Sequence, residues 1–399
     1  MGQSTFPVPS SGSSTSTILP VNASSVILDG SLTSASTYTT TVNGNGGIAY
    51  LTATDNPATI TVSGTAYSVP ANTVVASKAF GASTSVTVAA NFIGTPSSFT
   101  ASTMPSSSFW QNVTYGLVGA TPTYVAVAQG PTTSGAYSTN GSTWTASTMP
   151  SSSNWFGVTY GNGYFVAVAY TTTAGAYSTN GTTWTASTMP SSSNWYAVTY
   201  GNGYYVAVQQ SGTTAGAYST NGTTWTASTM PSSVNWFGVT YGNGYFVAVA
   251  GGTTAGAYST NGTTWTASTM PSSSAWRGVT YGNGYFVAVA QSTTAGAYST
   301  NGTTWTASTM PSLSTWFGVT YGSGYYVAVA YGTAGAYSTN GTTWTASTMP
   351  SSSNWDSVTY GNGYYVAVQG SSTTAGAYFA QSIALPVNFG IYAGPTTIN

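Results

Sequence analysis

Few side chains of this 399-residue chain could carry acid–base or charge chemistry. The chain has no His and no Cys, and charged residues make up 1% of it. They are Asp29, Asp55, Lys78, Arg277 and Asp356. Enzymes usually work with a His, a Cys, a Lys or a pair of carboxyl groups at the reacting bond. The inventory therefore predicts a protein that is not an enzyme, with no catalytic residue, no metal site and no cofactor.

The charge balance also limits the partners. A formal net charge of -1 offers no basic surface to nucleic acid. No apolar run is long enough for a membrane span, and the first residues lack the pattern of a secretory signal. We therefore expect no nucleic-acid partner and no membrane insertion. The 31 Tyr, 13 Trp and 13 Phe predict a folded chain in spite of its many Ser, Thr and Gly residues.

Most of these aromatic residues belong to an internal repeat. The hexapeptide TASTMP recurs about every forty residues, which is typical of propeller and solenoid folds. Its copies begin at Thr100, Thr145, Thr185, Thr226, Thr266, Thr306 and Thr345.

Each repeat contains four short segments that favour β-strands. In one copy they lie at 155–160, 164–169, 174–178 and 183–188. We interpret the Asn-Gly pairs that follow the first and third segments, at 162–163 and 180–181, as type I′ hairpin turns. Four antiparallel strands per repeat predict an all-β protein built as a seven-bladed β-propeller.

The two ends of the repeat array complement each other. The last copy stops after Phe379 without a fourth segment, whereas an extra fourth segment, SFTASTMP, precedes the first complete copy at 98–105. We therefore expect the ring to close, with Phe99–Thr103 as the outer strand of the seventh blade.

One motif within the repeat resembles a known family. The segment STNGTTW is similar to the Asp-box, or BNR, repeat of sialidase-type propellers, with Asn in place of Asp and a turn one residue shorter. In that family the box is a structural turn between the third and fourth strands. The whole repeat, from 98 to 380, also resembles propeller repeats in tail and fibre proteins of tailed phages. The copies of the motif are Ser138–Trp144, with Ser142 replacing a Thr, and Ser178–Trp184, Ser219–Trp225, Ser259–Trp265, Ser299–Trp305 and Ser338–Trp344.

Differences among the copies indicate a binding face. They concentrate beside the first-strand Trp and in the connection between the second and third strands, which should emerge on one face of the disc. Aromatic side chains and amides there would suit uncharged glycans. Free drift of surface loops, and burial of the Trp residues between blades, remain alternatives. The candidate ligand-binding residues are Arg277, Asp356, Phe156, Tyr196, Phe237, Phe317, Tyr170, Tyr331, Trp155, Trp195, Trp236, Trp276, Trp316 and Trp355.

The remaining segments suggest further parts. We expect a Ser/Thr/Pro-rich arm at 1–20, a small all-β sandwich or barrel at 21–92 for attachment or oligomerisation, and a linker at 93–98. The propeller should occupy 98–382, and 383–399 should form a C-terminal tail.

These expectations favour a phage virion surface protein, a fibre or receptor-binding component that displays the propeller to host glycans or another surface receptor. It would be extracellular without a secretory signal peptide, and it would contact other virion subunits through residues 1–92. A self-assembling filament or capsid-decoration protein and a free bacterial lectin or adhesin are the alternatives. With no His and three carboxyl groups, its unfolding free energy should stay nearly constant between pH 5 and 9.

Overall fold

The protein is described by a computed structural model, which covers residues 95–380 except Pro131 and, outside them, the backbone of strands β1 to β8 and β31. The chain forms two units, Met1–Thr95 with Ala380–Asn399, and Pro96–Phe379. Every element in these ranges is a β-strand, and no helix among them could span a membrane. The all-β prediction is confirmed. Of the arm predicted at 1–20, residues 1–18 lie outside the described residues, and Leu19–Pro20 form strand β1.

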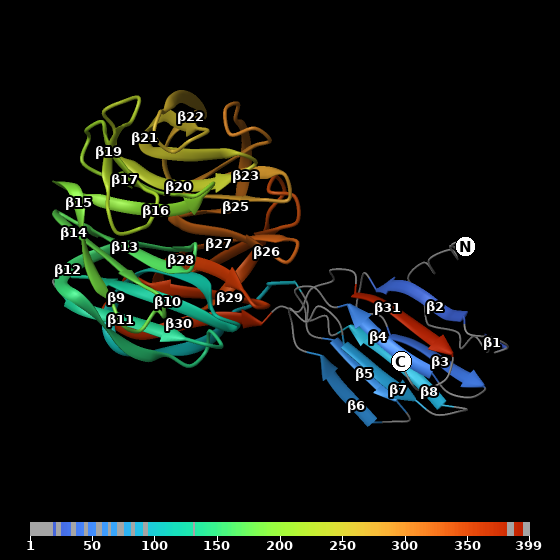
Figure 1. The fold of residues 1–399 in the computed structure, drawn as a ribbon. Helices are drawn as coiled ribbons and strands as arrows, with labels where there is room; N and C mark the ends of the chain where they lie inside the picture. The colour runs from blue at the N-terminus through green and yellow to red at the C-terminus, as the bar shows by residue number, and fades with distance from the viewer. Residues whose placement is uncertain are drawn as a thin grey trace. The chain divides into compact units, whose positions relative to one another are not determined.

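The first unit contains two sheets (Figure 1). One has the order β1 (Leu19–Pro20), β3 (Thr37–Asn43), β8 (Thr84–Ala90), β5 (Ala58–Val62) and β6 (Thr65–Val69). The other has the order β2 (Ser25–Leu32), β31 (Val387–Ala393), β4 (Gly47–Thr52) and β7 (Ala76–Phe80).

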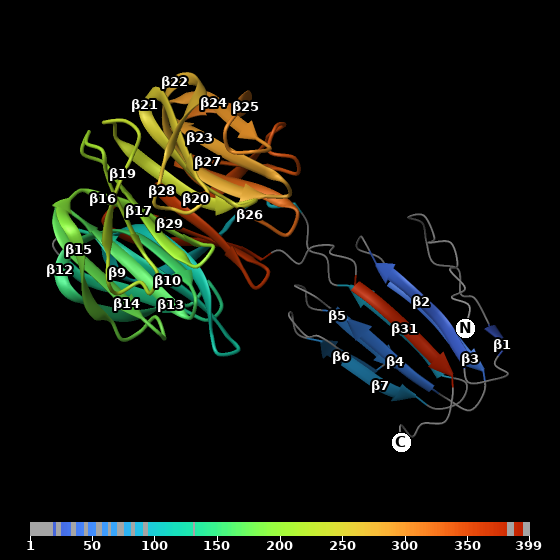
Figure 2. The ribbon, with the colours of Figure 1, turned by 45° about the horizontal axis from the view of Figure 1, so that its top comes forward.

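Strand β31 corrects the expectation of a C-terminal tail at 383–399. It lies between β2 and β4 and pairs antiparallel with both (Figure 2). The second unit is therefore inserted in the sequence between two parts of the first.

The strand pairings divide the second unit into seven blades with four antiparallel strand segments each, consistent with the predicted propeller. Blades 1 to 3 use β9 (Thr100–Val118), β10 (Thr121–Gln129), β11 (Thr132–Ser138), β12 (Thr145–Gly161), β13 (Tyr164–Tyr170), β14 (Thr172–Ser178), β15 (Thr185–Ser193), β16 (Trp195–Gly201), β17 (Tyr204–Gln209), β18 (Ala215–Ser219) and β19 (Thr226–Thr229). Blades 4 to 7 use β20 (Trp236–Gly242), β21 (Tyr245–Ser259), β22 (Thr266–Gly282), β23 (Tyr285–Gln291), β24 (Thr293–Ser299), β25 (Thr306–Ser314), β26 (Trp316–Gly322), β27 (Tyr325–Ser338), β28 (Thr345–Gly361), β29 (Tyr364–Gln369) and β30 (Thr373–Ala380). Long strands such as β12 form the last strand of one blade and the first strand of the next.

The ring closes as the sequence predicts. Strand β30 pairs antiparallel with the start of β9, which places Tyr378 opposite Thr100 and Ala375 opposite Thr103. The ring centroids of Phe99 and Phe379 are 6.0 Å apart at the same joint. The first strand of each blade also contacts that of the next blade around the whole circle, including β28 with β9.

The core lies between the blades. Valines from the second strand of one blade pack against the Trp, Phe and Ala side chains of the next, as Val125 and Val127 do against Trp155 and Phe165. This follows from the alternation in the VAVA segment, which sends Val to one side of the sheet and Ala to the other. Each first-strand Trp is completely buried. Its indole N–H donates to the backbone oxygen four residues earlier, as from Trp155 to Ser151 at 3.2 Å.

The two Asn-Gly turns of a repeat differ in structure. Asn162 and Gly163 have φ values of 46° and 82°, which fits the predicted type I′ turn. The second prediction is wrong, because Asn180 has no positive φ. Its side-chain Oδ1 instead accepts the backbone N–H groups of Thr182 and Thr183, both at 2.9 Å. The second turn is therefore a longer loop held by a side chain.

Candidate functional site

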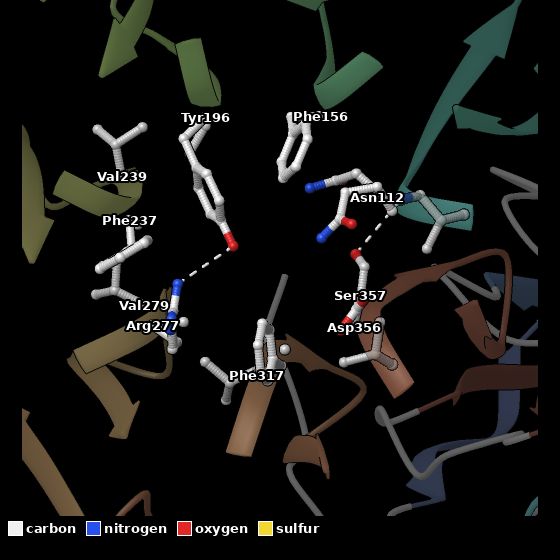
Figure 3. A pocket seen from close by; sticks show the side chains of 18 of the residues that line it. Asn112, Phe156, Tyr196, Phe237, Val239, Arg277, Val279, Phe317, Asp356 and Ser357 are labelled. Carbon is white, nitrogen blue, oxygen red and sulfur yellow. Dashed lines mark hydrogen bonds between the residues drawn. The ribbon is translucent and has the colours of Figure 1, made fainter. Parts of the chain in front are cut away.

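A cavity of about 180 Å³ lies where the first strands of all seven blades meet. Each blade contributes residues that follow its first-strand Trp (Figure 3). We call the residue directly after this Trp the ring position. The ring positions are Gln111, Phe156, Tyr196, Phe237, Arg277, Phe317 and Asp356.

A β-bulge explains why the ring position lines the cavity. Trp155 pairs with Ala169 and Gly157 pairs with Val168, so Phe156 between them has no partner in the ladder. The same register shift occurs at this position in the other six first strands. A bulge changes the direction of the extra side chain. The Trp side chain therefore enters the core, whereas the next side chain reaches the cavity.

Three aromatic ring positions form a continuous arc. The ring centroids of Phe156 and Tyr196 are 5.1 Å apart, and those of Tyr196 and Phe237 are also 5.1 Å apart. These are favourable separations for tilted and edge-to-face aromatic contacts. Burial raises the pKa of Tyr196 to about 12. Its hydroxyl therefore stays protonated at neutral pH and remains a hydrogen-bond donor in this arc.

Several ring positions also contact a second residue of the same blade. We call the residue after the VAVA or VAVQ segment the backing position. Phe156 stacks on the backing residue Tyr170 at 4.8 Å, and Phe317 stacks on Tyr331 at 4.7 Å. The seven backing positions are Gln129, Tyr170, Gln210, Gly251, Gln291, Tyr331 and Gly370.

Two blades have Gly at the backing position. A Cβ added at Gly251 would overlap the ring of Phe237, and a Cβ added at Gly370 would overlap the carboxyl group of Asp356. The bare backbone therefore gives these two ring side chains the space that they occupy. Ring and backing positions differ among the blades, and in these blades the two are in direct contact.

Arg277 is held on several sides. Its Cζ lies 3.7 Å from the centroid of the Phe237 ring and 5.1 Å from that of Phe317, which are cation–π distances. Its Nε donates to Oε1 of the backing residue Gln291 at 2.7 Å. Its Nη1 lies 3.5 Å from the hydroxyl of Tyr196, a contact drawn in Figure 3. These contacts fix the guanidinium beside the cavity.

Asp356 is the carboxyl group of the cavity. It is 9% exposed, and burial raises its pKa from 3.8 to about 7. A hydrogen bond from the Tyr331 hydroxyl and the charge of Arg277 oppose this rise without cancelling it. Its Oδ1 is buried and has no hydrogen-bond partner. With this raised pKa we expect the unfolding free energy to change between pH 5 and 9, in place of the constant value expected from the sequence, because one buried carboxyl group is enough to make stability depend on pH.

The structure brings together eight of the candidate residues. Phe156, Tyr196, Phe237, Arg277, Phe317 and Asp356 line the cavity, and Tyr170 and Tyr331 support two of them. The prediction that the six candidate Trp residues bind a ligand is wrong, because they have no exposed area. The alternative, burial between blades, is confirmed.

The sequence-based prediction did not include some residues that line the cavity. Gln111 occupies the ring position of blade 1, and Asn112 and Ser357 follow ring positions. The hydroxyl of Ser357 accepts the backbone N–H of Val113 at 3.3 Å, which joins blades 7 and 1. Comparison of the repeats could have identified Gln111, because it stands in the same column as Arg277 and Asp356.

The cavity combines apolar and polar groups. It offers aromatic faces, amide groups, two hydroxyls, one guanidinium and one carboxyl group. Among the described residues, no group of three or more His, Cys, Asp or Glu could hold a metal ion. A single carboxyl group does not supply the pair that glycoside hydrolysis requires.

Comparison with solved structures shows the fold. A streptogramin B lyase structure matches with a TM-score of 0.60 at 13% identity, over 72% of this chain and 95% of that chain. Virginiamycin B lyase from Staphylococcus aureus matches with a TM-score of 0.62 at 13% identity, over 70% of this chain and 98% of that chain. YCF48 bound to D1 peptide matches with a TM-score of 0.55 at 13% identity, over 76% and 96%. No family model matches the sequence, and no curated protein sequence matches it. The chain therefore has a propeller repeat fold.

Proposed function

We propose that this protein is a non-enzymatic binding protein and that a saccharide group of a glycan binds in the cavity where the seven first strands meet, which we call the axial cavity. One observation carries the proposal. The seven repeats agree closely in their core positions, yet they place five kinds of side chain (Gln, Phe, Tyr, Arg and Asp) at the ring position. Variation that concentrates at a cavity, in repeats that are otherwise so alike, is expected when the cavity contacts a ligand.

The lining supports a saccharide group. The faces of aromatic side chains such as Phe156 and Phe317 suit the C–H surface of a sugar ring. The amides of Gln111 and Asn112 and the hydroxyl of Tyr196 can bond to sugar hydroxyls. Such a mixture of apolar faces and a few polar groups is typical of small-molecule sites.

The absence of catalysis is part of the proposal. The similar virginiamycin B lyases are enzymes, and one was solved in a catalytically inactive form, with a histidine replaced by alanine, together with quinupristin. This chain contains no His at any position. We therefore infer that the fold is shared and that a reaction dependent on such a histidine is not.

A virion surface is the location that we propose, with the propeller as a displayed head and the first unit as the attachment part. The resemblance to Asp-box and phage fibre repeats supports it. In the motif Ser178–Trp184, the Oδ1 of Asn180 accepts two backbone N–H groups and the Ser178 hydroxyl accepts that of Gly181 at 2.8 Å. An Asp carboxylate could accept the same bonds, which supports the view that Asn replaces Asp in this motif.

A self-assembling filament or capsid-decoration protein is the second candidate. It would use the outer strand edges, which have no charged residue to block pairing. Each outer strand, however, already makes a parallel bridge to the following blade, as Thr103 does to Thr143 and Thr148 to Thr183. This partial cover favours ligand binding over edge-to-edge polymerisation. A free lectin or adhesin would differ in that it does not co-purify with particles.

A glycan array with the full chain tests the proposal. We expect the wild type to bind a defined set of glycans, and Phe237→Ala and Phe317→Ala to weaken the binding. Leu313→Ala is the matched control, because Leu313 is 75% exposed and is not part of the cavity lining. If no glycan is bound, or if all three variants bind like the wild type, the proposal is wrong. Ordered polymers at micromolar concentration without glycan binding would favour the second candidate.

A further inference from the structure

The two charged residues of the propeller share one cavity. Between positions 95 and 380 the sequence has one cation, Arg277, and one carboxylic acid, Asp356, and both occupy ring positions. Placing charge in a partly buried site costs free energy unless the charge is compensated. A chain that avoids charge elsewhere in these repeats, yet keeps it at this position, indicates a role in the cavity.

Arg277 has hydrogen-bonding capacity that the protein does not use. A guanidinium has five N–H donors in a planar fork. One is bonded to Gln291 and another lies at the distance limit of a bond to Tyr196. The other donors have no acceptor among the described residues. The cation–π contact with Phe237 and the hydrogen bond to Gln291 hold the guanidinium in place, so little conformational entropy would be lost when an acceptor arrives.

Asp356 lies near enough for the charge of Arg277 to lower its pKa, but among the described residues the two form no salt bridge. Its carboxyl group lies over Gly370 and takes part in a hydrogen bond with Tyr331. Burial raises the pKa of the group to about 7, so the carboxyl group is mostly protonated well below that pH. The tyrosines that face it, Tyr196 and Tyr331, have raised pKa values and stay neutral. Well below pH 7 the cavity therefore carries the positive charge of Arg277 without an equal negative charge from Asp356.

We propose that the axial cavity binds its ligand through an oxyanion group, which the free N–H donors of Arg277 engage. A carboxylate or a phosphate presents two oxygens with the spacing of the guanidinium fork. The inference rests on the proposed glycan-binding function and deepens it: the bound saccharide carries an acidic group, and the aromatic arc contacts the rest of its ring.

The inference is tested by calorimetric titration of the full chain at pH 6, which compares the affinities of closely related saccharides. D-glucuronate and D-glucose differ at C6, where a carboxylate replaces the hydroxymethyl group, and the methyl ester of glucuronate keeps the carbonyl group without the charge. We expect glucuronate to bind roughly ten- to a hundredfold more tightly than glucose or the ester. Inorganic phosphate is the further arm: if it competes with glucuronate, both use one oxyanion site. If phosphate binds while glucuronate is no better than glucose, the oxyanion site takes a free or esterified phosphate.

Substitutions connect the preference to the guanidinium. We expect Arg277→Gln to remove the preference for glucuronate over glucose, and Arg277→Lys, which keeps the charge without the fork, to retain part of it. Gln291→Ala should weaken glucuronate binding because it removes the acceptor of Nε that helps to hold the guanidinium in position. Gln210→Ala, at the same backing position of blade 3, should not. Thermal unfolding identifies variants that fail to fold. If Arg277→Gln does not fold, the glucuronate preference of the more conservative Arg277→Lys tests the inference.

Two results would overturn the inference. Equal binding of glucuronate, its ester and glucose, unchanged in both Arg277 variants, would leave a glycan-binding protein without an oxyanion site. No binding of any saccharide or of phosphate at millimolar concentration would remove the inference together with the proposed function.

Discussion

The ring of Phe317 lies parallel to that of Tyr331, with their centroids 4.7 Å apart and their planes inclined by 7°. Phe317 faces the axial cavity, and Tyr331 comes from the end of the second strand segment of the same blade, within β27. The ring position and the backing position of this blade, which both differ among the repeats, therefore meet in one stacked pair. Such pairs indicate that the backing residue fixes the orientation of the ring residue, and with it what the cavity presents.

A double-mutant cycle on this pair tests the coupling. We expect Phe317→Leu and Tyr331→Leu to interact by about 0.5–1.5 kcal/mol in the free energy of unfolding, the usual range for aromatic pairs. Tyr331→Leu should also weaken ligand binding although Tyr331 is not part of the cavity lining. The control is the cycle of Phe317 with Tyr170, which backs blade 2 and should show no coupling. Additive effects in both cycles would contradict the pairing.

Gly251 should be essential for the position of Phe237. A methyl group at Gly251 would overlap the aromatic ring, so we expect Gly251→Ala to cost about 1–3 kcal/mol of unfolding free energy, as overpacking does. In a Phe237→Ala background the same substitution should cost little, because the obstructing ring is gone. Denaturant unfolding of the four proteins measures this. An equal cost in both backgrounds would mean that the backbone, and not the ring, resists the methyl group.

Asp356 should make stability depend on pH. Its pKa is raised from 3.8 to about 7 in the folded protein, so the folded state holds a proton that the unfolded state releases between these values. Stability is therefore highest at low pH and falls as the pH rises toward 7. We expect a loss of roughly 2–3 kcal/mol between pH 5 and 8. Asp356→Asn should abolish most of this slope in denaturant titrations, and a wild type as flat as the variant would contradict the assignment.

Substitution of Asn by Gly should change the free energy of unfolding very differently in the two Asn-Gly turns. Asn162 serves through its positive φ, which Gly adopts freely, so Asn162→Gly should be nearly neutral. Asn180 serves through its Oδ1, so Asn180→Gly should cost about 1–2 kcal/mol for two lost hydrogen bonds. Asn180→Asp should restore most of this stability at pH 7. Chemical denaturation distinguishes the sites, and equal costs at both would refute the distinction.

The sequence contains most of the information on the fold. Its repeat gives the number of blades, and the complementary ends near Phe99 and Phe379 give the closure, because both are local patterns that need no knowledge of distant neighbours. The pairing of β31 with β2 and β4 could not be predicted in this way. It joins segments from opposite ends of the chain, and a β-prone run does not reveal its partner.

The sequence was enough to predict most positions of the site, but not how their side chains are oriented. Alternation along the first strand does not show that a bulge turns Phe156 away from the ladder and towards the axis. The dipeptide Asn-Gly reads alike in both turns, and the Ser two residues before Asn180 distinguishes the second. The behaviour of Asp356 depends on burial and on Tyr331 and Arg277, which come from blades 6 and 5.

The most direct measurement follows phenylalanine ring resonances by NMR while the glycan that binds best on the array is added. The full chain would carry ¹³C-labelled Phe, and single Phe→Leu substitutions would assign the signals. The account predicts that Phe156, Phe237 and Phe317 shift on binding, while Phe109, which is 44% exposed and is not among the lining residues, does not. Saturating binding that leaves all three cavity rings unchanged would contradict the axial site.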